Sequence, residues 1–257
     1  MTVIAVFNQK GGVGKTTIAA NLAAAIAKNG VEPLVIDLDP QAHLTALWQQ
    51  RPKSPASISS FYKGQSSLLD LAVSLNDGIR FIPAHLELAR VDVIPSRQQA
   101  NLRRLKQAIE AEMLEQSGIP IIIDCSPALG ILSFSALFAA DLVLIPVAAE
   151  YLALNGAQIL SRTLAGLEKL SGPKERRYLI NRYIPGRGTV ENVTEELENH
   201  FPGQVLKARI REHESLVEAI GWGADIFSFD PNAAASDDFS YLLDELLESG
   251  QLVLPHR

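Results

Sequence analysis

The sequence opens with an apolar run, TVIAVFN, that leads through a glycine-rich turn directly into a helical pattern over Lys15–Asn29. A short apolar run of this kind is typical of a buried strand, and apolar residues at helical spacing indicate the helix. The alternation recurs along the chain, with further strand-like runs PLVIDLD, IRFIPA, IPIIIDC, DLVLIPV, YLINRYI and GQVLKARI. Strands that are apolar on both faces and separated by helices predict an α/β fold: a single doubly wound, mostly parallel sheet with helices on both faces, spanning residues 1–257 as one domain.

The segments between these runs mostly carry the period of an amphipathic helix. We expect helices over Pro95–Ser117, around Ser133–Ala140, and over Ala153–Leu170, Val190–His200 and about Asp237–Leu247. The first of these is expected to bury Leu102, Leu105, Ile109 and Met113. By contrast, the stretch RPKSPASISSFYKGQSS (51–67) is rich in proline and serine, and we expect a polar loop there.

Composition excludes several classes of protein. A formal net charge of −6 over 257 residues argues against a surface that is basic throughout, although a local basic patch remains compatible with it. The single cysteine, Cys125, excludes an internal disulfide, a four-thiolate zinc site and a Cys-X-X-Cys redox pair. No secretory leader and no apolar run of about 20 residues is present, so we expect a cytoplasmic protein.

The glycine-rich turn has the composition of a phosphate-binding loop, since it follows a strand and opens a helix. Its glycines let backbone N–H groups turn inward around phosphate oxygens, and the helix start adds the positive end of its dipole. Lys15 would neutralise the β- and γ-phosphates, and the Thr16 hydroxyl would bind Mg²⁺. The phosphate-binding residues are expected to be Gly11, Gly12, Val13, Gly14, Lys15, Thr16 and Thr17. The alternative is a glycine-rich turn without a ligand.

Three carboxylates end two of the strand-like runs. Asp37 and Asp39 lie two residues apart in VIDLDPQ, so their side chains should point the same way at the carboxyl end of a strand, where open α/β sheets bind ligands. Asp124 directly follows three isoleucines, which is the form of a Walker B carboxylate. Together with Thr16, Asp124 is an expected metal-binding residue.

The loop KGGVGKTT resembles the signature of the deviant Walker ATPases, the family of ParA, MinD and the nitrogenase iron protein. Gln9 stands where an ordinary loop has its first glycine, and Lys10 is the additional lysine of that family. The resemblance implies that Lys10 reaches the phosphates of a partner subunit across a nucleotide-sandwich dimer. It also implies that Asp39 orients or deprotonates the attacking water and that Asp37 lies near the metal, so the catalytic residues would be Lys10, Lys15 and Asp39.

Other segments carry the same resemblance. IIIDCSPALG is similar to the second switch of the family, D-x-P-P-x-x-G, with Ser126 in place of the first proline. YLINRYIPGRG places Asn181 where relatives read the adenine edge, although an asparagine at the end of a strand is also a common turn former. ARIREHESLVEA resembles the segment beside the base, with Arg211 at a proline position, so Arg211 is also expected to bind the nucleotide.

Within the family, AAEYLALNGAQIL (148–160) is close to the corresponding segment of ParA and Soj partition proteins. The chain begins at its first strand, which matches the forms without an N-terminal DNA-binding extension. The resemblance implies nonspecific DNA binding through Arg187, Lys207, Arg209 and Arg211, while a second basic position of the family falls on Ser215. A cluster of arginines that is merely a solvated face is the alternative.

The implied protein is an Mg²⁺-dependent ATPase that forms a homodimer with ATP, binds nonspecific double-stranded DNA, and partitions or positions a chromosome, a plasmid or another cargo. A ParB-like or cargo-adaptor protein would stimulate hydrolysis, and the protein would be associated with the nucleoid. A MinD-like or flagellar-positioning ATPase is one alternative, but the end LESGQLVLPHR lacks a basic membrane helix. The other is a nucleotide-gated DNA scaffold with negligible turnover. The single cysteine excludes a nitrogenase-type reductase.

Overall fold

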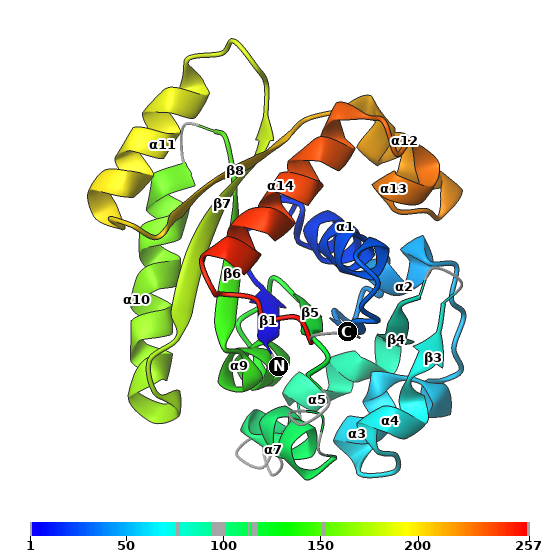
Figure 1. Ribbon diagram of the computed structural model, residues 1–257. Coiled ribbons are helices and arrows are strands. Elements are labelled where there is room, and N and C mark those ends of the chain that lie inside the picture. Colours follow the sequence, from blue (N-terminus) through cyan, green and yellow to red (C-terminus); the bar gives the residue numbers. More distant parts are fainter. Residues whose placement is uncertain are drawn as a thin grey trace.

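An eight-stranded sheet forms the centre of the computed structural model, which describes residues 2–75, 78–93, 101–112, 114, 118–150 and 153–255 (Figure 1). The strands, in spatial order, are β3 (Val73–Ser74), β4 (Arg80–Ile82), β2 (Leu34–Leu38), β5 (Ile121–Cys125), β1 (Val3–Val6), β6 (Leu142–Ala148), β7 (Glu175–Tyr183) and β8 (Val205–Arg211). Every neighbouring pair is parallel except β3 and β4, which are antiparallel. The predicted doubly wound, mostly parallel sheet is confirmed.

Helices cover both faces of the sheet, and alternate residues of the central strands supply the two cores. In β1, Ile4 and Val6 pack into one core with α1 (Lys15–Lys28), α2 (His43–Leu47), α12 (Glu214–Trp222), α13 (Ile226–Phe229) and α14 (Ala234–Glu248). Val3 and Ala5 face the other core, with α3 (Ile58–Lys63), α4 (Leu68–Leu71), α5 (Ala89–Val93), α7 (Arg104–Ala111), α9 (Ile131–Ala139), α10 (Ala153–Ser171) and α11 (Thr189–His200). Two short 3₁₀ turns, η1 (Ser54–Ala56) and η2 (Leu86–Leu88), complete the described elements.

Most predicted helices lie within a few residues of their expected positions, but several described helices, among them α12 and α13, were not predicted. The sequence analysis assigned no helix to α12, because Val217, Ile220 and Trp222 are apolar yet exposed and blur its amphipathic period. The short α13 was missed as well; it begins at a cap in which the Asp225 carboxylate accepts hydrogen bonds from two backbone N–H groups. Tertiary packing and capping, more than periodicity, therefore determine this part of the chain.

The predicted helix Pro95–Ser117 is only partly described. Residues 94–100, 113 and 115–117, and with them Met113, lie outside the described residues. In the described part, a turn at Arg103 interrupts the helix, and α7 begins at the next residue. Leu105 and Ile109 are buried as predicted, whereas Leu102 is half-buried.

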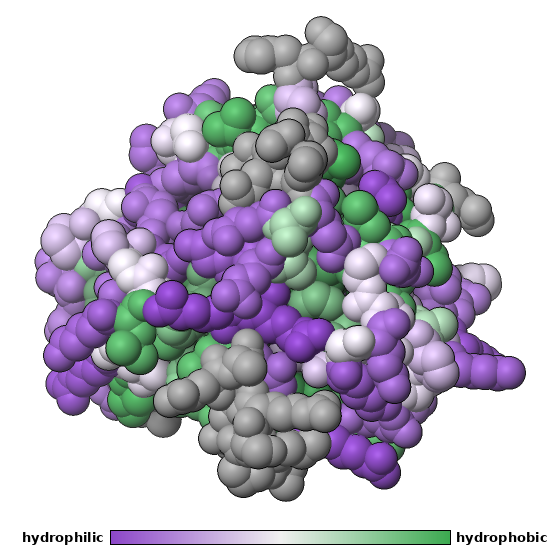
Figure 2. Space-filling view, turned by 90° about the horizontal axis from the view of Figure 1, so that it is seen from below, coloured by the Kyte–Doolittle hydropathy of each residue, from purple (hydrophilic) through white to green (hydrophobic). Residues whose placement is uncertain are grey.

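The surface seen from the underside of the Figure 1 view is mostly hydrophilic, and its hydrophobic residues form small separate groups (Figure 2). The described part of this face therefore offers no broad apolar area of the kind that marks a stable docking surface. Among the described residues, no helix combines the length and the apolar character needed to cross a bilayer.

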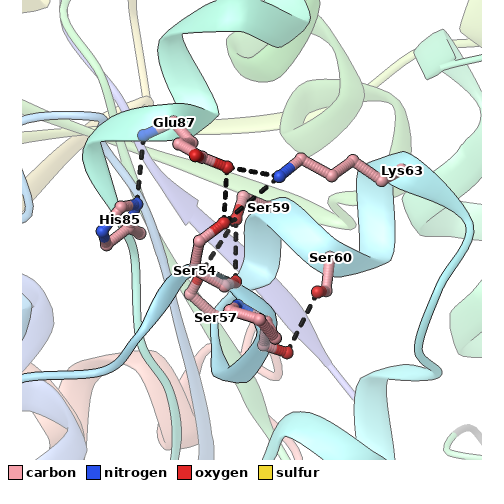
Figure 3. A network of polar contacts seen from close by, with 8 residues as sticks. Ser54, Ser57, Ser59, Ser60, Lys63, His85 and Glu87 are labelled. Carbon is pink, nitrogen blue, oxygen red and sulfur yellow. Dashed lines mark hydrogen bonds and ion pairs between the residues drawn. The ribbon is translucent and has the colours of Figure 1, made fainter.

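The expected polar loop at residues 51–67 is wrong for most of its length, because this stretch contains η1, α3 and the capped start of α4. Ser57 and Ser59 are completely buried, and their hydroxyls hydrogen-bond each other at 2.8 Å. Ser54 donates to the Glu87 carboxylate at 2.5 Å, and Lys63 also pairs with Glu87 (Figure 3). Serines that satisfy one another in this way can be buried at little cost, so composition alone misidentified the segment.

Candidate active site

The candidate site lies at the carboxyl ends of the central strands, beside β1, where the strand order reverses. β1 pairs with β5 on one side and β6 on the other, while the chain leaves β1 through α1 toward β2. Asp37 of β2 and Asp124 of β5 are direct partners in the register. This is the switch point at which open α/β sheets bind ligands, and it brings the predicted motifs together as expected.

The glycine-rich loop requires glycine at two positions. Gly12 and Gly14 have φ values of 74° and 90°, in the left-handed region that other residues rarely adopt. A Cβ atom at Gly14 would also lie 2.2 Å from Nδ2 of Asn181. That amide donates a hydrogen bond to the carbonyl oxygen of Val13 at 2.7 Å, so the end of β7 holds the loop in place.

Lys15 is largely buried at the floor of this loop. Its ammonium donates to the carbonyl oxygen of Lys10 at 3.0 Å, and burial lowers its pKa although the nearby Asp124 carboxylate opposes this shift. A cavity of about 620 Å³ lies above it, lined by the loop, Thr16, Asp39 and the start of α2. A buried ammonium at the beginning of α1 is suited to binding an anion.

Thr16 and Asp124 form a candidate cation site. The threonine hydroxyl donates to Oδ2 of Asp124 at 2.8 Å, while Oδ1 of Asp124 is buried and has no hydrogen-bond partner among the described residues. Burial, and after it the neighbouring Asp37 charge, raise the pKa of Asp124 well above its usual value. An orphaned carboxylate oxygen beside a hydroxyl fits Mg²⁺, which uses few protein ligands and takes the rest from phosphates and water. Accordingly, the described residues contain no cluster of three or more His, Cys, Asp or Glu suited to a metal.

Asp37 and Asp39 occupy different environments. Asp37 is completely buried: Oδ1 accepts from the Asp39 backbone N–H at 3.0 Å, and Oδ2 accepts from the Thr45 N–H at 2.9 Å and the Thr45 hydroxyl at 2.7 Å. Burial raises the pKa of Asp37 to about 6, and the Thr45 bonds oppose that shift. Asp39 lines the cavity, and its Oδ1 accepts from the Gln41 N–H at 2.9 Å. Asp37 thus bonds to residues of the segment that follows β2, and its assignment as a metal ligand stays a prediction.

Lys10 lies outside this cavity. Its ammonium forms an ion pair with Oε2 of Glu150 at 2.5 Å, between side chains that are 46% and 53% exposed. The hydrogen bond from Lys10 is the main reason why the pKa of Glu150 is lowered. No sequence motif points to Glu150, which follows β6 and is 140 residues from Lys10. The Lys10 ammonium is therefore held at the surface of its own subunit by Glu150, while the Lys10 carbonyl oxygen accepts from Lys15.

A second cavity of about 230 Å³ adjoins the first, since Gly12, Gly14 and Thr17 line both. Asn181 and Arg211 line it as well, which brings the two predicted base-contacting residues together. The Arg211 side chain, however, is bonded to both carboxylate oxygens of Asp238 in α14, at 2.8 and 2.7 Å. Its positive charge is therefore compensated within the subunit.

Arg182 also lines the second cavity, although no sequence motif points to it. It donates to the Gly12 carbonyl oxygen at 3.2 Å and forms an ion pair with Glu212 at 2.8 Å. Its φ is 55°, an uncommon backbone conformation for a residue other than glycine. Backbone strain of this kind tends to concentrate at ligand sites.

The other residues predicted to bind DNA lie at the surface or near it. Arg187 is exposed in the turn between β7 and α11. Lys207 is exposed on β8 and Arg209 is half-buried there. Within the described ranges, none of these three side chains forms an ion pair, in contrast to Arg211. Ser215 is buried at the start of α12.

Comparison with known proteins extends the match beyond the phosphate loop. A family model described as an AAA domain matches residues 1–174. The chromosome partitioning protein ParA of Caulobacter vibrioides is 31% identical over 251 residues, which cover 96% of this chain and 94% of that protein. The sporulation initiation inhibitor protein Soj of Bacillus subtilis is 32% identical over 254 residues, covering 96% of this chain and 99% of Soj. The structure of a cobyrinic acid a,c-diamide synthase from Mycobacterium smegmatis, with an ATP analogue and magnesium, aligns with a TM-score of 0.83 at 28% identity, covering 99% of this chain and 98% of that one.

Proposed function

The chain belongs to the ParA/Soj family of deviant Walker ATPases, and from this premise we propose that it is an ATP-dependent ATPase that partitions or positions DNA or another cellular cargo. The Caulobacter ParA and the Bacillus Soj match the chain over nearly its whole length, including the segments outside the phosphate loop. The name of the Caulobacter relative is that of a chromosome partitioning protein. A positioning role is the function that this family membership supports.

The observation that carries the proposal is the arrangement of Lys15, Thr16 and Asp39 around one cavity, with Asp124 hydrogen-bonded to Thr16. Lys15 would neutralise phosphate charge from the floor of the loop, and Thr16 with Asp124 would hold Mg²⁺. Bound Mg²⁺ would supply electrostatic stabilisation of the charge that develops during phosphoryl transfer. Asp39, on the wall of the cavity, would orient water or accept its proton, while Asn181 in the adjoining cavity would contact adenine.

The dimer and its partners are the finer part of the proposal. We infer that ATP closes two subunits into a sandwich in which Lys10 leaves Glu150 and contacts the phosphates of the other subunit. A charge supplied in this way stabilises phosphoryl transfer only after two subunits meet, which ties hydrolysis to assembly. A ParB-like or cargo-bound protein would then stimulate hydrolysis and dissolve the dimer.

For nonspecific double-stranded DNA, Arg187, Lys207 and Arg209 are the proposed contacts, because no partner among the described residues compensates their charge. Arg211 is a weaker candidate, since Asp238 already neutralises it. Binding of this kind would place the protein on the nucleoid. It should also weaken steeply with added salt, because each phosphate contact releases counterions.

The test measures ATP hydrolysis and DNA retention together. The proposal expects ATP-dependent retention on nonspecific duplex DNA, together with turnover that rises when DNA and the cargo-bound partner are added. Retention with negligible turnover under every condition would favour a nucleotide-gated scaffold. ATP-dependent pelleting with anionic vesicles and no DNA retention would favour a MinD-like regulator. Purification of the chain with ATP trapped on it would identify the partner that accompanies it.

A further inference from the structure

A threonine of α2, Thr45, links three segments of the site. The Thr45 hydroxyl donates to Oδ2 of Asp37 at 2.7 Å and accepts a hydrogen bond from the Ala84 backbone N–H at 2.8 Å. Asp37, Thr45 and Ala84 are each no more than 3% exposed. Both hydrogen-bonding functions of the hydroxyl are therefore used, in an interior where an unsatisfied polar group is expensive.

The same carboxylate holds the backbone of the residue that faces the cavity. Oδ1 of Asp37 accepts from the Asp39 N–H at 3.0 Å, so a path of two hydrogen bonds joins the Thr45 hydroxyl to the main chain of Asp39. Asp39 lines the cavity above Lys15, whereas neither Asp37 nor Thr45 lines it. Only Asp39 of these three residues is thus placed to touch bound substrate.

The turn between β2 and α2 is strained, and the hydrogen bonds from Asp39 and Thr45 to Asp37 hold it in place. Ala42 has a φ of 54°, a left-handed conformation for a residue with a Cβ, and its N–H bonds back to the Asp39 carbonyl oxygen at 2.8 Å. Such a conformation persists only where the surroundings determine it. Ala84, which donates to Thr45, lies shortly before η2. The η2 residue Glu87 is in turn held by Ser54 and Lys63 (Figure 3).

We propose that Thr45 is a positioning residue: it fixes Asp37, and through Asp37 the backbone of Asp39, so that the Asp39 carboxylate meets the attacking water. In this assignment Asp37 acts on Asp39 and not on the metal, because its hydrogen-bonding partners are Asp39 and Thr45, in the segment that follows β2. The inference rests on the proposed ATPase function. A wild-type chain that neither binds nor hydrolyses ATP would overturn that function, whereas the variants below test the positioning role in an active chain.

The experiment compares Thr45→Val with Thr45→Ser. The valine keeps the shape but removes the hydroxyl, and we expect kcat to fall by about 10- to 100-fold, while the Kd of a fluorescent ATP analogue with Mg²⁺ changes by less than about threefold. The serine keeps the hydroxyl and should restore kcat to within about threefold of wild type. Thr194→Val, which removes a hydroxyl bond within α11, is the control and should leave kcat unchanged. Equal kcat for Thr45→Val and wild type, or equal losses for valine and serine, would overturn the proposal.

A double variant separates positioning from a general loss of structure. If Thr45 acts through Asp39, then Thr45→Val added to Asp39→Ala should slow turnover by no more than about twofold beyond Asp39→Ala alone. Full additivity of the two losses would refute the link.

If Thr45→Val does not fold, Asp37→Asn takes its place. It should lower kcat without changing the Mg²⁺ concentration needed for binding of the ATP analogue. A large rise in that Mg²⁺ requirement would identify Asp37 as a metal ligand and would overturn the assignment, as would an unchanged kcat.

Discussion

The ion pair between Lys10 and Glu150 predicts that removing the charge of Glu150 strengthens ATP-dependent dimerisation, whereas removing the charge of Lys10 weakens it. If Lys10 acts only on the partner subunit, it must leave Glu150 when the dimer forms. Because the side chains are 46% and 53% exposed, solvent screens the pair, and such pairs contribute only about 0.2–1 kcal/mol each. Two pairs break per dimer, so Glu150→Gln should tighten ATP-dependent dimerisation by about 2- to 30-fold.

Lys10→Ala should have the reverse and larger effect. Loss of one partner from a desolvated charge pair costs about 2–5 kcal/mol, so dimerisation should weaken by more than tenfold. Binding of ATP to the single subunit should persist, since Lys15 and Thr16 remain. Sedimentation velocity with ATP measures both effects, in an Asp39→Ala background that slows turnover. Glu191→Gln, at an exposed position on α11, makes the same change in net charge and serves as the control.

The outcome for Glu150→Gln decides between two roles of the glutamate. A tighter dimer would mean that Glu150 holds Lys10 in reserve in the separate subunit. A dimer weakened as much as by Lys10→Ala would refute this reasoning, because Glu150 would then contribute to the assembled state.

Mixing Lys10→Ala subunits with Asp39→Ala subunits tests directly whether Lys10 acts on the partner subunit. One site of each heterodimer then keeps a working Asp39 and receives a Lys10, so activity should reappear; heterodimers as inactive as both parents would contradict it.

Three further predictions follow from single contacts. Lys15→Ala should abolish binding in a fluorescent ATP titration, and normal affinity there would exclude this cavity as the site. Gly14→Ala should lower the thermal unfolding temperature, because the positive φ and the clash with Asn181 together cost about 1–3 kcal/mol or more of folding free energy. Adding Asn181→Ala should restore only the part of this stability that the clash removes. Full recovery would show that the positive φ is unimportant. The Lys63 hydrogen bond lowers the pKa of Glu87 to about 2, from an ordinary value of 4.5. The stability that it confers is therefore present above about pH 4.5 and is lost as pH falls toward 2. Glu87→Gln should flatten that part of the unfolding curve, and an unchanged pH dependence would contradict the assignment.

The sequence predicted those parts of the fold and site that are encoded in contiguous residues. The phosphate loop has its glycines, lysine and threonine within seven positions, and a strand and a helix flank it. The strands were identifiable because they are apolar on both faces, which only a covered parallel sheet requires. The burial of residues 51–67 was not predictable in this way, because its serines are satisfied partly by Glu87, which lies 33 positions from Ser54.

The state of the site residues depends on partners that no local pattern reveals. A parallel sheet aligns the ends of strands that are distant in sequence, so the loop after β1 meets the residues that follow β6 and end β7. Glu150, 140 positions from Lys10, therefore determines where that lysine rests, and Arg182, 170 positions from Gly12, holds a carbonyl oxygen of the phosphate loop. The motif determines which groups can bind phosphate, whereas these distant partners determine which of them are engaged before a nucleotide or a second subunit arrives. Relatives that share the motif but differ at these two positions should therefore bind ATP similarly and dimerise with different affinities.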